Sequence, residues 1–148
     1  MDAGDQDTLS DADRAVWHAF KRATETVTTA VERDILAAAG LTGAEFGVLD
    51  RLALQDGTMR QSDLGRSMHW NKSRLSHQVT RMQERRLLTR STLGAAMATV
   101  SITQQGLEAL SLARPAHARA IRAHLTEPLT SEQQEAFRTA LGCLTRAT

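Results

Sequence analysis

Apolar residues recur at three- and four-residue steps over residues 9–39, which places them on one face of an α-helix. Ser10 or Asp11 has the side-chain oxygen to cap the start of this helix, and Gly40 follows its last periodic position. The helix is long for a globular domain, so we expect its apolar stripe to pack on a partner chain as well as on its own domain. The stripe consists of Val16, Phe20, Ala23, Val27, Ala30 and Val31.

The next segment begins with a helix start signal. Thr42 and Glu45 have the spacing of a capping box, in which the hydroxyl and the carboxylate each accept a backbone N–H. Asp56 and Gly57 are turn formers that stop the helix, and Met59 fits a very short strand after them. The inward positions of the helix are predicted to be Phe46, Leu49, Leu52 and Ala53.

Two further helices, joined by a tight turn, are predicted next. The first is short and covers residues 60–67, with the turn at residues 69–70. Asn71 is a favourable N-cap for a second helix over residues 72–86. Polar and basic residues occupy most of its faces, and its inner face comprises Leu75, Val79 and Met82.

A hairpin follows these two helices. Residues 87–90 and 96–102 are predicted as its two strands, and Gly94 permits the turn between them. Two short helices joined by a tight turn and followed by a hairpin are the order of a winged helix-turn-helix. We therefore predict a mainly α fold, in which an α/β winged domain is combined with helices at the two ends of the chain.

Helices complete the C-terminal end. Thr103 can cap a helix to about residue 125, which Pro115 is expected to kink or interrupt. Ser131 and Gln134 have the spacing of a second capping box and predict a last helix to about residue 147. Because apolar faces remain at both chain ends, we expect a dimerisation module there. The predicted division is an N-terminal dimerisation helix, a winged helix-turn-helix domain and C-terminal dimerisation helices, over residues 1–40, 41–106 and 107–148.

The composition fits one soluble globular domain, since 41% of the 148 residues are hydrophobic and 24% are charged. No apolar stretch approaches the ~20 residues that span a bilayer, and the acidic, polar N-terminus is unlike a secretory signal. The single cysteine, Cys143, excludes an internal disulfide, and we expect it to be a packed small residue rather than a redox sensor. We expect a cytoplasmic protein without a membrane partner.

Positive charge is concentrated in one segment. The chain as a whole has a net charge of +1, whereas residues 60–90 contain eight basic and two acidic side chains. A basic block in a nearly neutral chain is typical of a phosphate-binding surface, with a solvated basic helix as the alternative. Sixteen of the 18 basic residues are arginine, which suits bidentate recognition of phosphate and guanine, although a GC-rich genome would also favour arginine. Aromatic residues make up only 3%, which argues against a stacking platform for single-stranded nucleic acid.

Four stretches resemble one family in their order and spacing. They are LTGAEFGVL at residues 41–49, QSDLG at 61–65, SRLSHQVTRMQERRLLTR at 73–90 and VSITQQG at 100–106. They resemble the multiple antibiotic resistance regulator (MarR) family over about residues 9–147. The resemblance implies a homodimeric, sequence-specific regulator of transcription on double-stranded DNA. It further implies a ligand-responsive repressor on a pseudo-palindromic operator. Because the sequence has no Gly-rich phosphate loop and no nucleophile motif, we expect no enzymatic activity.

The sequence departs from the family pattern in two places. Arg86 stands where the family usually has glycine, so we expect the preceding helix to end in another way. The wing at residues 91–97 is short and carries no charge, so it lacks the arginine that commonly enters the minor groove in the family. We therefore expect Arg90, at the base of the wing, to contact phosphate. We also expect the recognition helix to make more of the contacts that distinguish one DNA sequence from another. An uncharged wing also supports the alternative function, a protein-binding adaptor that keeps the fold without specific DNA binding.

An α-helix fits the major groove with its N-terminal residues nearest the base edges. Arg74 can take guanine O6 and N7, and Gln78 can pair with adenine unless it faces inward. The predicted recognition-helix contacts are Ser73, Arg74, His77, Gln78 and Arg81. The predicted contacts to the DNA backbone are Arg60, Gln61, Ser62, Arg66, Lys72, Arg85, Arg86 and Arg90.

The resemblance also implies a pocket for a small aromatic or phenolic effector, where the winged domain meets the dimerisation helices. Packing in the core is the alternative for its aromatic members, and Trp70 in particular can plug the core below the turn. No cofactor is expected. His117, His124 and His18 lack the tight spacing of a metal site, so we expect no metal. The candidate pocket residues are Trp17, His18, Phe20, Phe46, Arg51, His69 and Trp70.

Overall fold

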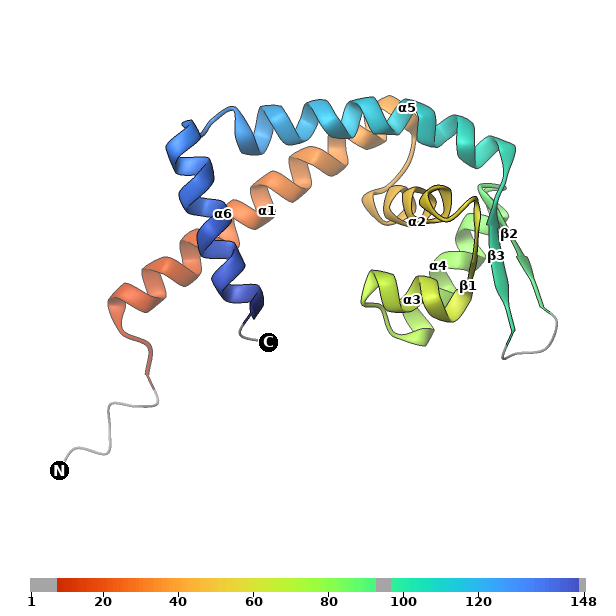
Figure 1. The fold of residues 1–148 in the computed structure, drawn as a ribbon, viewed down its shortest axis with the longest axis horizontal. Coiled ribbons are helices and arrows are strands. Elements are labelled where there is room, and N and C mark those ends of the chain that lie inside the picture. The colour runs from red at the N-terminus through yellow and green to blue at the C-terminus, as the bar shows by residue number, and fades with distance from the viewer. Residues whose placement is uncertain (1–7, 93–96, 147–148) are drawn as a thin grey trace.

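The computed structural model describes residues 8–92 and 97–146. Its helices pack as an elongated upper layer of α1 and α5, with α6 at one end and the winged unit below the other end (Figure 1). The elements are, in chain order, α1 (Asp11–Ala39), α2 (Gly43–Leu54), β1 (Thr58–Arg60), α3 (Gln61–Met68), α4 (Lys72–Glu84), β2 (Leu88–Ser91), β3 (Thr99–Ile102), α5 (Gln104–Ile121), η1 (Arg122–Thr126) and α6 (Ser131–Arg146). The prediction of a mainly α, winged helix-turn-helix fold is confirmed.

The helix starts follow local side-chain chemistry. Of the two caps considered for α1, Ser10 and Asp11, it is Ser10 that accepts the backbone N–H of Asp13. The predicted capping box of α2 is also present: Glu45 N donates to Thr42 Oγ1 at 3.2 Å, and Thr42 N donates to Glu45 Oε2 at 2.9 Å. These bonds satisfy N–H groups that a helix start leaves without partners.

The capping box predicted at Ser131 and Gln134 is wrong by one residue. Thr130 exchanges the reciprocal bonds with Gln133, at 2.9 and 3.2 Å. The Gln134 amide instead donates to two carbonyl oxygens of the preceding turn, those of Thr126 and Leu129. Thr130 and Ser131 both carry a hydroxyl that could cap α6, and the structure shows that Thr130 does so.

The sheet is antiparallel with the order β1-β3-β2. Met59 and Arg90 both face Val100 in the register, one from each neighbouring strand. The predicted strands are therefore present: β2 is shifted by one residue, β3 is shorter than predicted, and β1 pairs with the other edge of β3. The turn predicted at Gly94 lies outside the described residues.

The end of α4 differs from the prediction. The helix stops at Glu84, two residues early, and Arg86 itself takes the left-handed conformation with φ 59°. Leu87 N donates to Met82 O at 3.0 Å, and Arg86 N donates to Gln83 O at 2.9 Å. This is a Schellman ending, the same termination that glycine provides in the family. The expectation of another kind of ending was wrong, because an arginine occupies the glycine conformation at a cost of about 1 kcal/mol.

Of the kink or interruption predicted at Pro115, the interruption is absent, because the helix continues through this residue. Pro115 lies inside α5, and the irregular turn comes only after Ile121, as the π-helical segment η1. Gly106 lies in the first turn of α5, close to the residue that precedes β2. A β-carbon at this position would overlap the carbonyl oxygen of Leu87. The glycine is therefore required by close approach of the two backbones.

The core lies inside the winged unit and under the end of α1. Ile35 is the buried residue of α1, whereas no residue of α6 is buried within the chain. The N-terminal half of α1 is bare, with Trp17 51% exposed, and Cys143 is exposed rather than packed. No described helix has the length and apolar character needed to cross a membrane. The core side chains include Leu41, Val48, Leu49, Leu52, Leu64, Val79, Met82, Leu88 and Val100.

Candidate nucleic-acid interface

The turn between α3 and α4 is fixed by its own backbone. His69 adopts φ 53°, and Trp70 N donates to Gly65 O at 3.0 Å. Asn71 Oδ1 then accepts the backbone N–H of Arg74 at 2.8 Å and caps α4. The two helices are thus held at a defined angle, as a helix-turn-helix requires.

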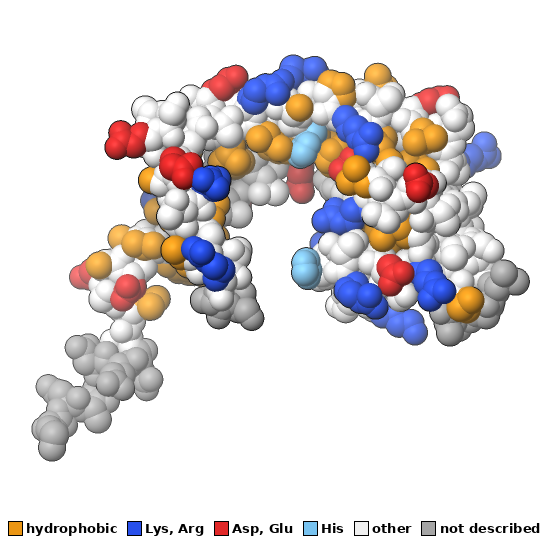
Figure 2. All heavy atoms as spheres, in the orientation of Figure 1, with side chains coloured by type: hydrophobic (Ala, Val, Ile, Leu, Met, Phe, Trp, Pro, Cys, Tyr) orange, Lys and Arg blue, Asp and Glu red, His pale blue; other side chains and the backbone are white. Residues whose placement is uncertain are grey.

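One face of α4 carries polar side chains into solvent. Ser73, Arg74 and His77 are exposed, together with Lys72 at the start of the helix. Lys and Arg side chains gather at the lower end of the winged unit, around α3 (Figure 2). The structure therefore brings the predicted base-reading residues together, with Gln78 as the exception.

Gln78 faces inward, which was the alternative to an adenine contact. Its side chain is 5% exposed, and its Oε1 atom accepts a bond from Arg81 Nη2 at 2.5 Å. The amide lies one position before Val79 on the buried side of α4, where its oxygen needs an internal donor. The adenine contact predicted for Gln78 is therefore wrong in this structure, and Arg81 gives up part of its donor capacity to it.

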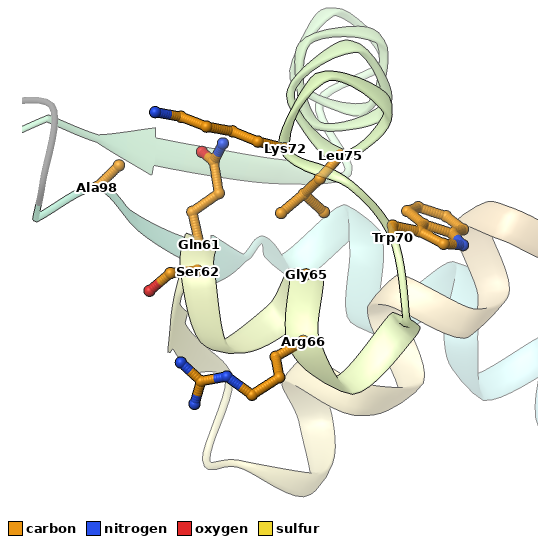
Figure 3. Close-up of a pocket in the computed structure, with 8 residues that line it drawn as sticks. All are labelled: Gln61, Ser62, Gly65, Arg66, Trp70, Lys72, Leu75 and Ala98. Atoms are coloured by element: carbon orange, nitrogen blue, oxygen red, sulfur yellow. The ribbon is translucent and has the colours of Figure 1, made fainter. Parts of the chain in front are cut away.

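A groove of about 350 Å³ lies between α3, the start of α4 and Ala98, the residue before β3 (Figure 3). Arg66 and Lys72 lie on opposite sides of it, and Ser62 adds a hydroxyl at its edge. Gln61 Oε1 is buried here without a hydrogen-bond partner among the described residues. Two cations and a hydroxyl around a groove form an arrangement that suits a phosphate group.

Arg85 has a role that the sequence did not indicate. Its Nη1 atom contacts both carboxylate oxygens of Glu45 at 2.5 Å, and its Nη2 atom donates to Gly40 O at 2.9 Å. Glu45 is only 4% exposed, so the arginine neutralises a buried charge. The prediction that Arg85 binds the DNA backbone is therefore corrected: it joins the end of α4 to the α1–α2 junction. Only the long sequence separation, 40 residues, hid this pair.

The other arginines predicted to contact phosphate are not bound to a buried carboxylate in the part of the chain that the structure describes. Arg60, Arg86 and Arg90 have no ion-pair partner within residues 8–92 and 97–146. Arg66 pairs with Asp63 at 3.4 Å, but its side chain is 80% exposed, so solvent screens that pair.

The predicted effector residues do not come together within one chain. Trp17 and Phe20 stack at 6.2 Å on the bare half of α1, where His18 is also exposed, and His69 and Trp70 belong to the α3–α4 turn. Arg51 donates to carbonyl oxygens of α2 and α3. A hollow of about 280 Å³ does lie where α1, α2 and α5 meet, and of the predicted set only Phe46 lines it.

Two histidines take structural roles in this region. His117 lies against Phe46, with ring centroids 4.6 Å apart, at the same hollow. His124 shares a hydrogen bond with Asp34 at 2.8 Å. This bond, followed by one from Arg33, holds the pKa of Asp34 below its ordinary value. Among the described residues, no group of three metal-ligating side chains is present.

The comparisons with known proteins agree with this geometry. Residues 39–95 match the model of the MarR family. AbsC, a MarR family transcriptional regulator from Streptomyces coelicolor, is 29% identical and superimposes with a TM-score of 0.83, over 95% of this chain and 96% of its own. Sco3205, a MarR family regulator of the same organism in complex with DNA, is 24% identical with a TM-score of 0.83, over 95% and 93%.

More distant structures share the same fold. BpsR from Bordetella bronchiseptica is 20% identical with a TM-score of 0.78, over 93% of this chain and 98% of its own. A search of curated protein sequences gives no match. The MarR family consists of transcription regulators rather than enzymes. The match of residues 39–95 and the shared fold over nearly the whole chain show that this chain is similar to the MarR family of winged helix-turn-helix transcription regulators.

Proposed function

We propose that the protein acts as a homodimer that binds double-stranded DNA by sequence and regulates transcription in response to a small molecule. The observation that carries the proposal is the exposed first turns of α4, where Ser73, Arg74 and His77 share one face. Lys72 and Arg66 lie beside this face, and the opposite face of α4 packs into the core. A structural relative, Sco3205, is described in complex with DNA.

The exposed apolar side chains at the chain ends support the homodimer. Trp17 and Phe20 on α1, and Phe137 and Leu144 on α6, are each at least 43% exposed. A second copy would remove them from water, which a monomer cannot do. In that dimer residues 1–40 and 107–148 form the dimerisation part and residues 41–106 the DNA-binding part. Two α4 helices about 34 Å apart would enter successive major grooves of a pseudo-palindromic site.

A small aromatic or phenolic effector fits the hollow between the two parts. It lies between α1, α2 and α5 and has Phe46 and His117 on its wall. Two proteins of this fold are described with aromatic ligands, 2,4-dichlorophenol in one case and 6-hydroxynicotinic acid in the other. An occupant of this hollow would change the spacing of the two winged units and release DNA, as in a repressor.

The proposal is tested by selection from randomised duplex DNA, followed by a salt titration of the selected site. We expect a palindromic sequence and a log-log salt slope of about −0.9 for each phosphate contact. Lys72→Ala should weaken binding to all sequences and reduce the slope by about one. Arg74→Ala should also remove the preference at one base position, worth about 1–3 kcal/mol.

Three results would contradict the proposal. Binding without an enriched sequence would indicate an architectural protein, and absence of binding at low salt would favour a protein-binding adaptor. A monomer in sedimentation analysis at micromolar concentration would contradict the homodimer.

A further inference from the structure

We propose that Trp70 is a positioning residue for Arg74 and thereby determines how strictly the protein selects guanine. The inference rests on the proposed function and assigns part of its specificity to a residue that itself need not touch DNA. It is carried by one contact: Arg74 Cζ lies over the indole ring, 4.3 Å from the ring centroid. At this distance the ring attracts a guanidinium through its π-electrons.

Trp70 forms a fixed platform. Its backbone N–H donates to Gly65 O at 3.0 Å, in the turn that the left-handed His69 closes. Its side chain is partly buried against the core beside Leu75. Figure 3 shows the indole next to the segment that leads from α3 into α4. Because the backbone of Trp70 is hydrogen-bonded and its ring packs against the core, the ring is the less mobile of the two groups. The contact therefore restrains the guanidinium of Arg74.

Arg74 keeps its donors free while its face is covered. Its backbone N–H is bound by Asn71, but its guanidinium has no hydrogen bond or ion pair with any described residue. Stacking uses the face of the planar group and leaves the N–H bonds at its edge available. A bidentate contact with guanine O6 and N7 needs two of those bonds in one plane.

Neighbouring arginines lack this combination. Arg81 donates to Gln78, and Arg85 is bound to Glu45. Arg74 is therefore the arginine of α4 that is both oriented and unpaired among the described residues. A side chain that is oriented before binding loses less conformational entropy when it binds DNA. This favours guanine, the base whose O6 and N7 atoms match the two N–H groups of the oriented guanidinium.

The test compares Trp70→Leu, Trp70→Phe, Arg74→Ala and the double variant Trp70→Leu/Arg74→Ala in the full-length protein. Leucine keeps an apolar side chain against the core and removes the π-face, and phenylalanine keeps a smaller ring. The readout is the affinity ratio between the selected duplex and the same duplex with 7-deazaguanine at the Arg74-dependent position, which lacks the N7 acceptor. Lys72→Ala is the matched control, because it removes a cation that does not contact the ring.

We expect Trp70→Leu to reduce this ratio about tenfold and Trp70→Phe to reduce it less, on the scale of a cation–π contact. In the Arg74→Ala background Trp70→Leu should change nothing, and Lys72→Ala should leave the ratio intact. A ratio that survives Trp70→Leu, effects that simply add, or tighter binding by the leucine variant would overturn the inference.

A measurement without DNA separates this inference from the proposed function. In the NMR spectrum of the free protein, the side-chain protons of Arg74 should show a ring-current shift that Trp70→Leu abolishes. An absent shift would overturn the inference even if the protein binds DNA and even if the leucine variant folds poorly. A wild-type protein that enriches no sequence would overturn the proposed function and the inference with it.

Discussion

Removal of Arg85 should destabilise the protein far more than removal of an ordinary surface arginine. Its guanidinium binds the Glu45 carboxylate, whose side chain is 5% exposed, while its own side chain is 47% exposed. In Arg85→Ala the carboxylate keeps, among the described residues, only its bond from Thr42 N. Gly40 O also loses its side-chain donor.

The magnitude follows from this asymmetric burial. Breaking a fully buried ion pair from one side costs about 3–5 kcal/mol. Because Arg85 is half exposed and solvent screens its charge, we expect about 2 kcal/mol, nearer the cost of one unsatisfied buried group. For a chain of this size that corresponds to a fall of about 4–8 °C in the melting temperature.

The assay is urea unfolding at a fixed protein concentration, since the proposed dimer makes stability concentration-dependent. Arg66→Ala is the control, because its side chain is 80% exposed, and it should lose no more than about 0.5 kcal/mol. Glu45→Gln in the Arg85→Ala background should recover part of the loss, since a neutral amide costs less to bury than an unpaired carboxylate.

A contrary result is easy to recognise. If Arg85→Ala unfolds at the wild-type urea concentration but lowers the salt slope of DNA binding by about one, then Arg85 is a phosphate contact. The structural link between α4 and the α1–α2 junction would then be wrong.

Four further substitutions test the local geometry. Gly106→Ala should cost at least about 1–3 kcal/mol in urea unfolding, because its β-carbon would overlap a backbone carbonyl oxygen. Gly142→Ala in α6 should instead stabilise the protein by about 0.5–1 kcal/mol, because the nearest atom, Arg146 Nη2, lies 3.9 Å from the added carbon. Equal effects of the two substitutions would refute the close approach at Gly106. Arg86→Gly should stabilise by about 1 kcal/mol, because it relieves the left-handed conformation, and a loss of stability would contradict that account. Asp34→Asn should be less stable than the wild type at pH 7, because the pKa of Asp34 is lowered by its bond to His124 and then by Arg33. A lowered pKa gives stability that is present above the ordinary value of 3.8 and lost as the pH falls through the folded value. The difference between variant and wild type should therefore be smaller at pH 3 than at pH 7, and an equal difference at both would contradict this origin.

Features that depend on a few neighbouring residues could be predicted from the sequence. The Ser10 cap, the capping box of Thr42 and Glu45 and the Asn71 cap each need only a side chain three residues from its partner. The apolar periodicity of α4 likewise identified its buried face. These signals, in their order along the chain, were enough for the winged helix-turn-helix fold.

Features that depend on tertiary contacts could not be predicted in the same way. Arg85 and Arg86 are adjacent and equally basic, yet one reaches Glu45 and the other takes a left-handed conformation. Gln78 shares the helical spacing of Leu75 and Met82, but whether a polar amide is buried there depends on a donor for its oxygen, which Arg81 supplies. The stacking of Arg74 on Trp70 also has no sequence signal beyond a four-residue spacing across a helix start.

The central claim, that the exposed face of α4 reads base edges, is tested most directly by parallel selections from randomised DNA with the wild type and Arg74→Ala. The account predicts a palindromic motif whose half-sites are about one helical turn apart for the wild type. It also predicts the same motif for the variant, with the preference for guanine lost at one symmetric pair of positions. Identical motifs from both proteins, or none from either, would contradict it.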